Sequence, residues 1–320
     1  MRVWFFGSGA VAVPTLRALA QSHALEMVVT QPDRPQGRGR RQAPTAVKQA
    51  ARQLTAPILD PPSVKDQALC ESLRHSSPDL LVVMAYGGIL PTPLLTMPRA
   101  GAFNVHPSLL PRYRGAAPIP WAIANGDSET GITVIQMDAQ VDHGPIVWQE
   151  RVPMLAVDTT ATLTERIGRL APAVLLKAMV ALESGGVAQI AQDEDRATVA
   201  PPLTKADGWM DWTLAAEVIA RRVRAFFPWP GSMTSWHGHA IKLLTVVAHD
   251  ATPCTPGVPP GTVRQVTSEA IIIQTGRGTV AVQRLQLAGG RPMPAGEFLL
   301  GHPMRAGDPL GSVSPSAENR

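Results

Sequence analysis

The first half of the chain alternates short apolar runs with helix-like patterns, which limits the fold more than any other feature. Apolar runs occur at residues 2–6, 27–30, 80–85, 101–105 and 132–137, and helical patterns separate them at residues 13–19, 43–54, 64–74 and 119–125. Strands that alternate with helices form a mostly parallel sheet with helices on both faces. The sequence therefore predicts an α/β fold with a Rossmann-like sheet over residues 1–183, closed by a long helix at residues 161–182.

The second half predicts a different architecture. Residues 184–204 are polar and lose periodicity, which indicates a linker, and a helical pattern follows at residues 214–226. Short β-rich segments separated by Gly and Pro turns then occur at residues 233–236, 240–247, 261–266, 270–275 and 279–287. This spacing predicts a small antiparallel β-barrel of the oligonucleotide-binding (OB) type over residues 205–311, with a tail at residues 312–320.

Composition excludes several classes of protein. Of 320 residues, 45% are hydrophobic and 17% charged, which is typical of a globular chain long enough for two domains. Cys70 and Cys254 lie far apart, which argues against a disulfide framework or a structural zinc site. No apolar stretch reaches the ~18 residues of a membrane span, and the first run is too short for a signal peptide. We therefore expect a soluble, cytoplasmic monomer that binds no metal and no membrane.

A glycine turn follows the first predicted strand. Gly7, Gly9 and Ala12 match the dinucleotide-binding pattern, in which glycines let the backbone approach a pyrophosphate. That pattern also needs an acidic residue at the end of the second strand, to hold a ribose. Here the second strand ends in Val28-Val29-Thr30-Gln31-Pro32, with Asp33 beyond the proline. A turn that packs helix on sheet is the favoured interpretation, and a nicotinamide-dependent dehydrogenase stays open as an alternative.

Positive charge is concentrated near the N-terminus, where residues 1–59 hold eight basic and two acidic side chains. Residues 31–41 combine two prolines and two glycines with four arginines, Arg34, Arg38, Arg40 and Arg41. With almost no apolar residue to bury, this segment is expected to be an exposed loop. A solvated loop is the alternative, but the planar donor fork of arginine suits phosphate, and open α/β folds bind ligands at this edge of the sheet. Further candidates for phosphate contacts are Arg221, Arg222 and Arg224.

A set of polar residues accompanies the fourth predicted strand. Asn104 and His106 are two residues apart, so their side chains point to the same face of an extended strand. Asp142, within Val141-Asp142-His143-Gly144, would add a carboxylate if its segment folds back onto them. An amide, an imidazole and an acid together suit acyl transfer to an amine, because they stabilise an oxyanion while moving protons.

The run Phe103-Asn-Val-His-Pro-Ser-Leu-Leu-Pro-Arg-Tyr-Arg-Gly115, with Asp142 36 residues past His106, resembles the folate-dependent formyltransferases. Residues 29–41, 81–87 and 225–230 narrow the resemblance to members whose formyl acceptor is methionyl initiator tRNA, and it covers nearly the whole chain. The resemblance implies that 10-formyltetrahydrofolate is the formyl-donor cosubstrate and methionyl initiator tRNA the partner. It also implies that Asn104, His106 and Asp142 are catalytic.

The roles follow from chemistry. The Asn104 amide and His106 would donate to the formyl oxygen as it gains negative charge. Asp142 near His106 would favour the imidazolium and help carry the proton, through water, from the attacking amine to the leaving nitrogen. No step requires a metal. The family geometry further implies that three loops surround the pterin through Tyr86, Gly87, Ile89, Leu90, Ser108, Leu109, Leu110, Pro111, Ala139 and Val141.

Some features depart from the family or admit other interpretations. Val11 stands where many relatives carry phenylalanine and His143 where threonine is frequent, which bears on the aminoacyl pocket. A hairpin turn is favoured over a metal site for residues 237–239, and core packing over base stacking for Trp209 and Trp212.

Two rival functions remain. Formyl transfer to glycinamide ribonucleotide or an amino sugar nucleotide leaves the arginines without a partner, and a noncatalytic RNA-binding protein leaves the three polar residues unexplained.

Overall fold

The structure is a computed structural model that describes residues 1–36, 41–185, 188–250 and 257–311. The chain forms two compact units. The first contains Met1–Pro118, Glu129–Met154 and Leu163–Pro201, and the second contains Ile119–Ser128, Leu155–Thr162 and the chain from Pro202 onward.

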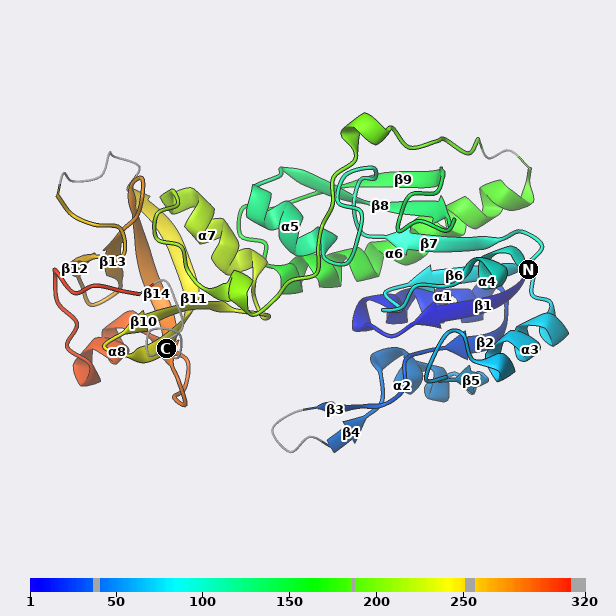
Figure 1. Ribbon diagram of the computed structural model, residues 1–320, viewed down its shortest axis with the longest axis horizontal. Helices are drawn as coiled ribbons and strands as arrows, with labels where there is room; N and C mark the ends of the chain where they lie inside the picture. Colours follow the sequence, from blue (N-terminus) through cyan, green and yellow to red (C-terminus); the bar gives the residue numbers. More distant parts are fainter. Residues whose placement is uncertain (37–40, 186–187, 251–256, 312–320) are drawn as a thin grey trace. The chain divides into compact units, whose positions relative to one another are not determined.

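The first unit is built on a seven-stranded sheet (Figure 1). In spatial order its strands are β5 (Ile58–Leu59), β2 (Ala24–Val29), β1 (Arg2–Gly7), β6 (Leu80–Met84), β7 (Ala102–His106), β8 (Glu129–Gln136) and β9 (Ile146–Pro153). The first five run parallel, and β8 and β9 continue the sheet antiparallel. Every residue of β6 is buried, so both faces of the sheet are covered. The predicted Rossmann-like fold is confirmed.

Helices connect and cover these strands. The first unit contains η1 (Ala10–Ala12), α1 (Val13–Ser22), α2 (Ala46–Gln53), α3 (Gln67–Ser76), α4 (Thr92–Thr96), most of α6 (Thr160–Glu183) and η2 (Glu194–Arg196). Trp4 and Phe6 of β1 share one hydrophobic cluster with leucines of α3 and α4. α3 begins three residues later than predicted because the Asp66 carboxylate accepts a hydrogen bond from the Leu69 N–H and caps the helix there.

Residues 31–41, which were expected to form an exposed loop, contain one short strand and the start of a second. β3 (Arg34–Gln36) pairs antiparallel with β4 (Arg41–Ala43), and we call residues 34–43 the arginine arm. Pairing between β3 and β4 provides hydrogen-bond partners for backbone groups without burying side chains. This suits a segment that has almost no apolar side chain to bury. The expected exposure is confirmed at Arg34 and Arg41.

The second unit is a small antiparallel sheet, as predicted. Its path is β10 (Ser232–Trp236), β11 (His239–Asp250), β14 (Thr279–Leu287), β13 (Ile271–Gln274) and β12 (Val263–Val266), and β15 (Met293–Pro294) pairs with β14. α5 (Pro118–Asn125), η3 (Ala206–Gly208), α7 (Ala216–Ala225) and α8 (Ala295–Gly301) accompany it. Residues 308–311 bridge to Ser235 on one edge and Thr262 on the other, which closes the sheet into a barrel.

Core packing was expected for Trp209 and Trp212, and it is seen at Trp212, while Trp209 is half-buried outside the core cluster. The Trp212 side chain is 1% exposed and packs in the barrel core, where its indole N–H donates to Thr234 Oγ1. His237 and Gly238 form the two-residue turn between β10 and β11, with φ of 48° and 75°. This is the left-handed geometry of a tight hairpin turn.

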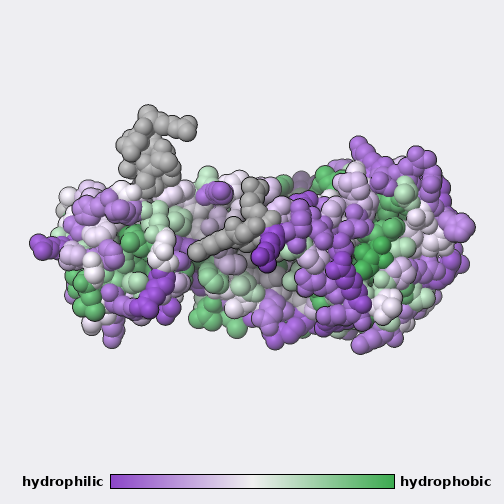
Figure 2. All heavy atoms as spheres, turned by 90° about the horizontal axis from the view of Figure 1, so that it is seen from below, coloured by the Kyte–Doolittle hydropathy of each residue, from purple (hydrophilic) through white to green (hydrophobic). Residues whose placement is uncertain are grey.

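Within the described ranges, no helix has the length and hydropathy needed to cross a bilayer. Figure 2 shows one face of the molecule, on which hydrophilic residues cover most of the visible surface and hydrophobic residues gather in separate patches.

Candidate functional site

The structure brings together the three predicted catalytic residues. Asn104 and His106 lie on one face of β7, and Asp142 comes from the loop between β8 and β9. Asn104 Nδ2 donates to Asp142 Oδ1 at 2.9 Å, and Asp142 Oδ2 lies 3.4 Å from His106 Nδ1. The His106 and Asp142 side chains are only 4% and 11% exposed, so little water weakens these interactions.

Contacts on the ring of His106 fix its orientation. Nε2 lies 2.8 Å from the carbonyl oxygen of Tyr113, and a carbonyl can only accept, so Nε2 carries a hydrogen. Nδ1 then faces Asp142 Oδ2 at 3.4 Å. Asp142 therefore lies between the Asn104 amide and the His106 ring, and contacts both.

Asp142 is held in an unusual backbone conformation. Its φ of 51° lies in the left-handed region, which costs a residue other than glycine of order 1–3 kcal/mol. The backbone N–H of Gly115 donates to its Oδ2 at 2.9 Å, and Gln192 Nε2 donates to the carbonyl oxygens of Asp142 and Gly144 at 2.8 Å each. The surrounding loops therefore stabilise a turn that its own residues do not favour.

Strands β8 and β9 brace the loop after β7. Thr133 Oγ1 on β8 donates to the Ser108 carbonyl at 2.6 Å, and Gln149 Nε2 on β9 donates to the Leu110 carbonyl at 3.0 Å. The Ser108 hydroxyl in turn donates to the Arg112 carbonyl at 2.7 Å. This bracing positions the Tyr113 carbonyl and the Gly115 amide beside the catalytic side chains.

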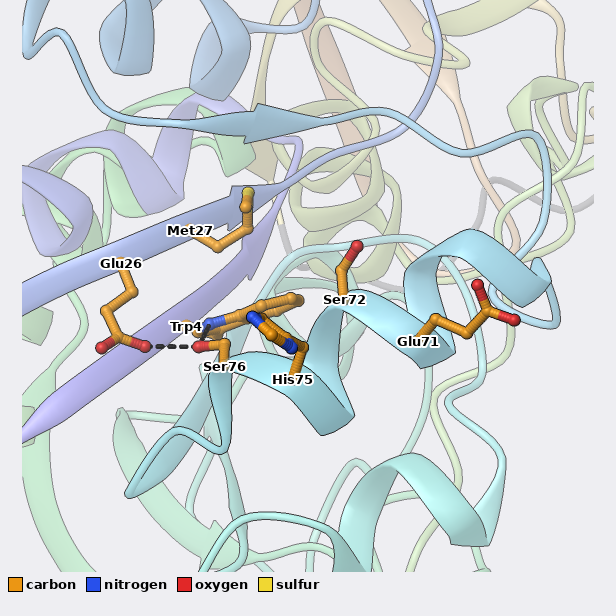
Figure 3. A pocket seen from close by; sticks show the side chains of 7 residues that line it. All are labelled: Trp4, Glu26, Met27, Glu71, Ser72, His75 and Ser76. Carbon is orange, nitrogen blue, oxygen red and sulfur yellow. Dashed lines mark hydrogen bonds between the residues drawn. The ribbon is translucent and has the colours of Figure 1, made fainter.

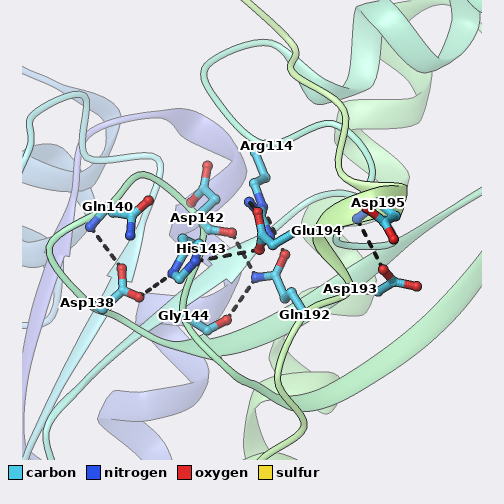
Figure 4. A network of polar contacts seen from close by, with 10 residues as sticks. All are labelled: Arg114, Asp138, Gln140, Asp142, His143, Gly144, Gln192, Asp193, Glu194 and Asp195. Carbon is cyan, nitrogen blue, oxygen red and sulfur yellow. Dashed lines mark hydrogen bonds and ion pairs between the residues drawn. The ribbon is translucent and has the colours of Figure 1, made fainter.

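Sequence reasoning missed a second set of site residues, in the segment predicted as part of a linker. Arg114 donates through Nε to Gln192 Oε1 at 3.0 Å and through both terminal nitrogens to Glu194, at 2.9 and 2.7 Å (Figure 4). The hydrogen bonds from Arg114 lower the pKa of the Glu194 carboxyl. Thr198 Oγ1 accepts from the Tyr113 N–H at 2.8 Å. The only sequence signal was a polar run without periodicity, which indicates a loop but not its contacts.

Gly144 ends the turn that carries Asp142, and its position leaves no room for a side chain. A Cβ there would lie 1.8 Å from the Gln136 carbonyl oxygen. We therefore expect Gly144→Ala to lower the free energy of unfolding by about 1–3 kcal/mol, as overpacking does. Thermal unfolding measures this loss. Gly301→Ala is the matched control, because nothing lies within 4 Å of a Cβ at that position.

The predicted folate residues divide into two groups. Gly87, Ile89, Ala139 and Val141 are exposed, while Tyr86, Leu90, Ser108 and Leu110 are buried and Leu109 and Pro111 partly buried. The buried side chains shape the loops, and the exposed ones are free to contact a ligand. The Tyr86 hydroxyl is buried without a hydrogen-bond partner among the described residues, and burial raises its pKa. An orphaned buried hydroxyl of this kind is one that a bound ligand can satisfy, which fits a folate site beside it.

The first glycine turn packs against Ala85, the residue that follows β6. The backbone N–H groups of Ser8 and Gly9 both donate to the Ala85 carbonyl at 3.1 Å, so they are not directed at a phosphate. Asp33 accepts from Lys48 Nζ at 2.6 Å, so its carboxylate is paired away from any ribose. The structure thus favours the packing turn over the dinucleotide alternative.

The base of the arginine arm is anchored. Lys48 Nζ bridges Asp33 and Asp60 at 2.6 and 2.7 Å, and the hydrogen bond to Asp33 is the largest cause of its raised pKa. Arg34 donates to Gln31 Oε1 at 3.1 Å, and Arg41 is exposed. Arg38 and Arg40 fall outside the described residues.

The arginines of α7 are less available than expected. Arg221, Arg222 and Arg224 each donate to a backbone carbonyl, of Ala124, Asp207 and Ala220 respectively. Burial lowers the pKa of Arg224, which is half-buried. To contact phosphate as proposed, these arginines would use side chains that already hydrogen-bond to the backbone of the second unit.

Two features elsewhere in the described chain do not point to chemistry. A hollow of about 480 Å³ is lined in part by Trp4, Glu26 and Ser76 (Figure 3). Its lining does not include Asn104, His106 or Asp142. The Trp4 indole donates to Ser76 Oγ at 2.9 Å, and that hydroxyl donates to Glu26, so these three polar groups pair with one another. In the described ranges, no group of three or more His, Cys, Asp or Glu residues could hold a metal ion.

Two family profiles match this chain, one in each half. A formyl transferase family profile matches residues 1–179, and the profile of the formyl transferase C-terminal domain matches residues 202–303. The methionyl-tRNA formyltransferase of Pelotomaculum thermopropionicum is 41% identical over 316 residues, which covers 98% of this chain and 99% of the relative.

Solved structures show the same fold. HypX from Aquifex aeolicus in complex with tetrahydrofolic acid has a TM-score of 0.60 at 16% identity, over 93% of this chain and about half, 47%, of the HypX chain. Glycinamide ribonucleotide transformylase 1 from Symbiobacterium toebii has a TM-score of 0.51 at 25% identity, over 59% of this chain and 94% of that one.

Proposed function

The chain belongs to the methionyl-tRNA formyltransferase family, and on that basis we propose which of its residues carry the reaction. It transfers the formyl group of 10-formyltetrahydrofolate to the free amino group of methionyl initiator tRNA, for translation initiation. The observation that carries the assignment of roles is the contact of Asp142 with both Asn104 and His106.

We propose that Asn104 and His106 stabilise the negative charge that develops on the formyl oxygen. When the amine attacks the formyl carbon, the new C–N bond forms and the carbonyl electrons move to oxygen. These electrons then return to restore the carbonyl, and the bond between the formyl carbon and the folate nitrogen breaks. In this proposal the second amide hydrogen of Asn104 is one donor to that oxygen, and His106 Nδ1, which lies 3.4 Å from Asp142 Oδ2, is the other and is shared with the carboxylate. Their side chains are held in place before substrate arrives, so little reorganisation is needed in the transition state.

We propose that Asp142 moves the proton. The attacking amine loses one proton and the departing folate nitrogen gains one, so the step is balanced without an outside acid. The Asp142 carboxylate accepts the amine proton, directly or through one water, and its contact with His106 Nδ1 provides the path back to the leaving nitrogen. The reaction needs no covalent bond to the protein.

The arginine arm is proposed to bind the tRNA. It begins at Arg34, five residues after β2 ends at Val29, and β2 is parallel to β7, whose last residue is His106. The arm and the catalytic residues therefore belong to the same edge of one sheet. Arginine forks on an anchored but exposed hairpin suit the phosphates of a tRNA end placed at that edge.

Replacing Arg34, Arg38, Arg40 and Arg41 with glutamine is expected to raise the KM for methionyl-tRNA and to weaken its salt dependence. The slope of log KM against log salt should fall by about 0.7–0.9 for each arginine that contacts a phosphate. Initial formylation rates over a salt series measure it. Arg99→Gln is the control, because the Arg99 side chain is 85% exposed but lies outside the arm. An equal effect on a small amine acceptor would count against a tRNA-binding arm.

The finer assignments complete the proposal. We propose residues 1–183 as the catalytic domain, residues 205–311 as an OB-like domain that adds tRNA contacts, and residues 184–204 as the connection. We further propose that the enzyme works as a monomer in the cytoplasm. Size-exclusion chromatography with light scattering tests the first of these two, because a stable dimer would double the measured mass.

Formylation assays with two different acceptors distinguish this function from formyl transfer to a small amine. The protein is supplied with 10-formyltetrahydrofolate and, in parallel, with methionyl initiator tRNA or glycinamide ribonucleotide, and the formylated product is measured. We expect N-formylmethionine in the first reaction and little product in the second. A preference for the small amine would show that the arginine arm serves another purpose. Tight tRNA binding with no formyl transfer would favour a noncatalytic RNA-binding protein.

A further inference from the structure

We propose that Gln192 is a positioning residue for formyl transfer, whose side-chain amide holds the turn of Asp142 so that the carboxylate stays between Asn104 and His106. This inference rests on the proposed roles of those three residues. Gln192 itself contacts none of their side chains and acts on the reaction through the backbone of Asp142.

Both hydrogens of the Gln192 amide are committed to this turn. Nε2 donates to the carbonyl oxygen of Asp142 and to that of Gly144, at 2.8 Å each. The two carbonyls lie on either side of His143, so one planar amide clamps both ends of the turn. Because the φ of Asp142 is 51°, the turn is intrinsically unfavourable, and it persists where surrounding contacts determine it.

Gln192 is oriented in turn by Arg114. Its Oε1 accepts from Arg114 Nε at 3.0 Å, and the guanidinium group is fixed from the other side by Glu194. Arg114 directly precedes Gly115, whose N–H donates to Asp142 Oδ2 at 2.9 Å. Figure 4 shows Gln192 between Arg114 and the turn that carries Asp142 and Gly144.

The same segment provides a matched control. Gln189 is three residues earlier, and its Nε2 donates to Gln136 Oε1 at 2.6 Å, a contact between two side chains. Gln189 thus secures the segment to β8 without touching the Asp142 turn. Replacing Gln189 tests whether a weaker attachment of this segment to β8 is enough to reduce activity. Replacing Gln192 tests the hydrogen bonds to the Asp142 and Gly144 carbonyls.

The experiment compares Gln192→Ala, Gln192→Glu and Gln189→Ala with the wild type in formylation of methionyl initiator tRNA. Misplacing a catalytic group by about 1 Å costs up to ~10²-fold in rate, so we expect kcat to fall about 10- to 100-fold in both Gln192 variants. Gln192→Glu still accepts from Arg114 but cannot donate to the two carbonyls. The KM values of both Gln192 variants should stay close to those of the wild type. Gln189→Ala should keep the wild-type kcat, KM and melting temperature.

A double-mutant cycle with Asp142→Ala separates positioning from general damage. If Gln192 acts only through Asp142, then adding Gln192→Ala to Asp142→Ala should change the residual rate by less than about threefold. The same loss in both backgrounds would overturn the proposal, and so would a wild-type kcat in Gln192→Glu. A wild-type protein without formyl transfer would instead refute the proposed function, so the two failures are distinguishable.

Discussion

Asp142→Asn is expected to lower kcat for formyl transfer by about 10²–10⁴-fold while the affinity for methionyl-tRNA stays near wild type. The substitution keeps the shape of the side chain but removes the charge that faces His106 Nδ1 at 3.4 Å and the group that accepts the proton of the amine. Single-turnover formylation with saturating folate measures the chemical step, and a filter-binding titration with charged tRNA measures affinity.

Asp138→Asn is the matched control for this prediction. Asp138 lies on the same loop, but its carboxylate contacts His143 Nδ1 and the Gln140 N–H instead of Asn104 or His106. Its loss should therefore change kcat far less. Equal rates for Asp142→Asn and the wild type would remove the carboxylate from the mechanism, and equal losses in the two variants would indicate a general effect of charge on the loop.

Asn104→Ala is the second large effect, with an expected loss of about 10²–10³-fold in kcat. The variant loses a donor to the developing oxyanion and also the hydrogen bond that orients Asp142 Oδ1 at 2.9 Å. Because the donor acts mainly in the transition state, KM for either substrate should change little. Steady-state kinetics over both substrate concentrations separates kcat from KM.

Gln136→Ala is the matched control for Asn104→Ala, because it also removes a side-chain amide. Gln136 ends β8 opposite Phe103, and its side-chain oxygen accepts from Gln189, away from the three catalytic side chains. We expect it to retain most activity. An Asn104→Ala enzyme that is as active as Gln136→Ala would show that another group stabilises the oxyanion.

Much of the fold was predictable because strong local patterns carry it. The buried parallel strands β1, β6 and β7 read as apolar runs, and tertiary structure did not override them. β9 escaped prediction because it is an edge strand with an alternating burial pattern, in which exposed positions such as Gln149 and Arg151 interrupt the apolar residues. The pairing of β3 with β4 was missed because neither strand buries a hydrophobic face.

The candidate site was predictable only in part. The spacing of Asn104 and His106 places both on one face of a strand, a consequence of local geometry. The return of Asp142 to them could be expected from chemistry and family resemblance but not from spacing, since it depends on the left-handed turn at Asp142 and on Gly115. Gln192 was not predictable, because its contacts span 50 and 48 residues and leave no periodic signal.

The central claim is that Asn104, His106 and Asp142 act as one unit around the carbon under attack. The most direct measurement is the single-turnover rate of the Asn104→Ala and Asp142→Asn double variant beside the two single variants. Residues that act together lose activity non-additively, so the double variant should be about as slow as the slower single variant. Losses that multiply would show independent contributions and contradict the account.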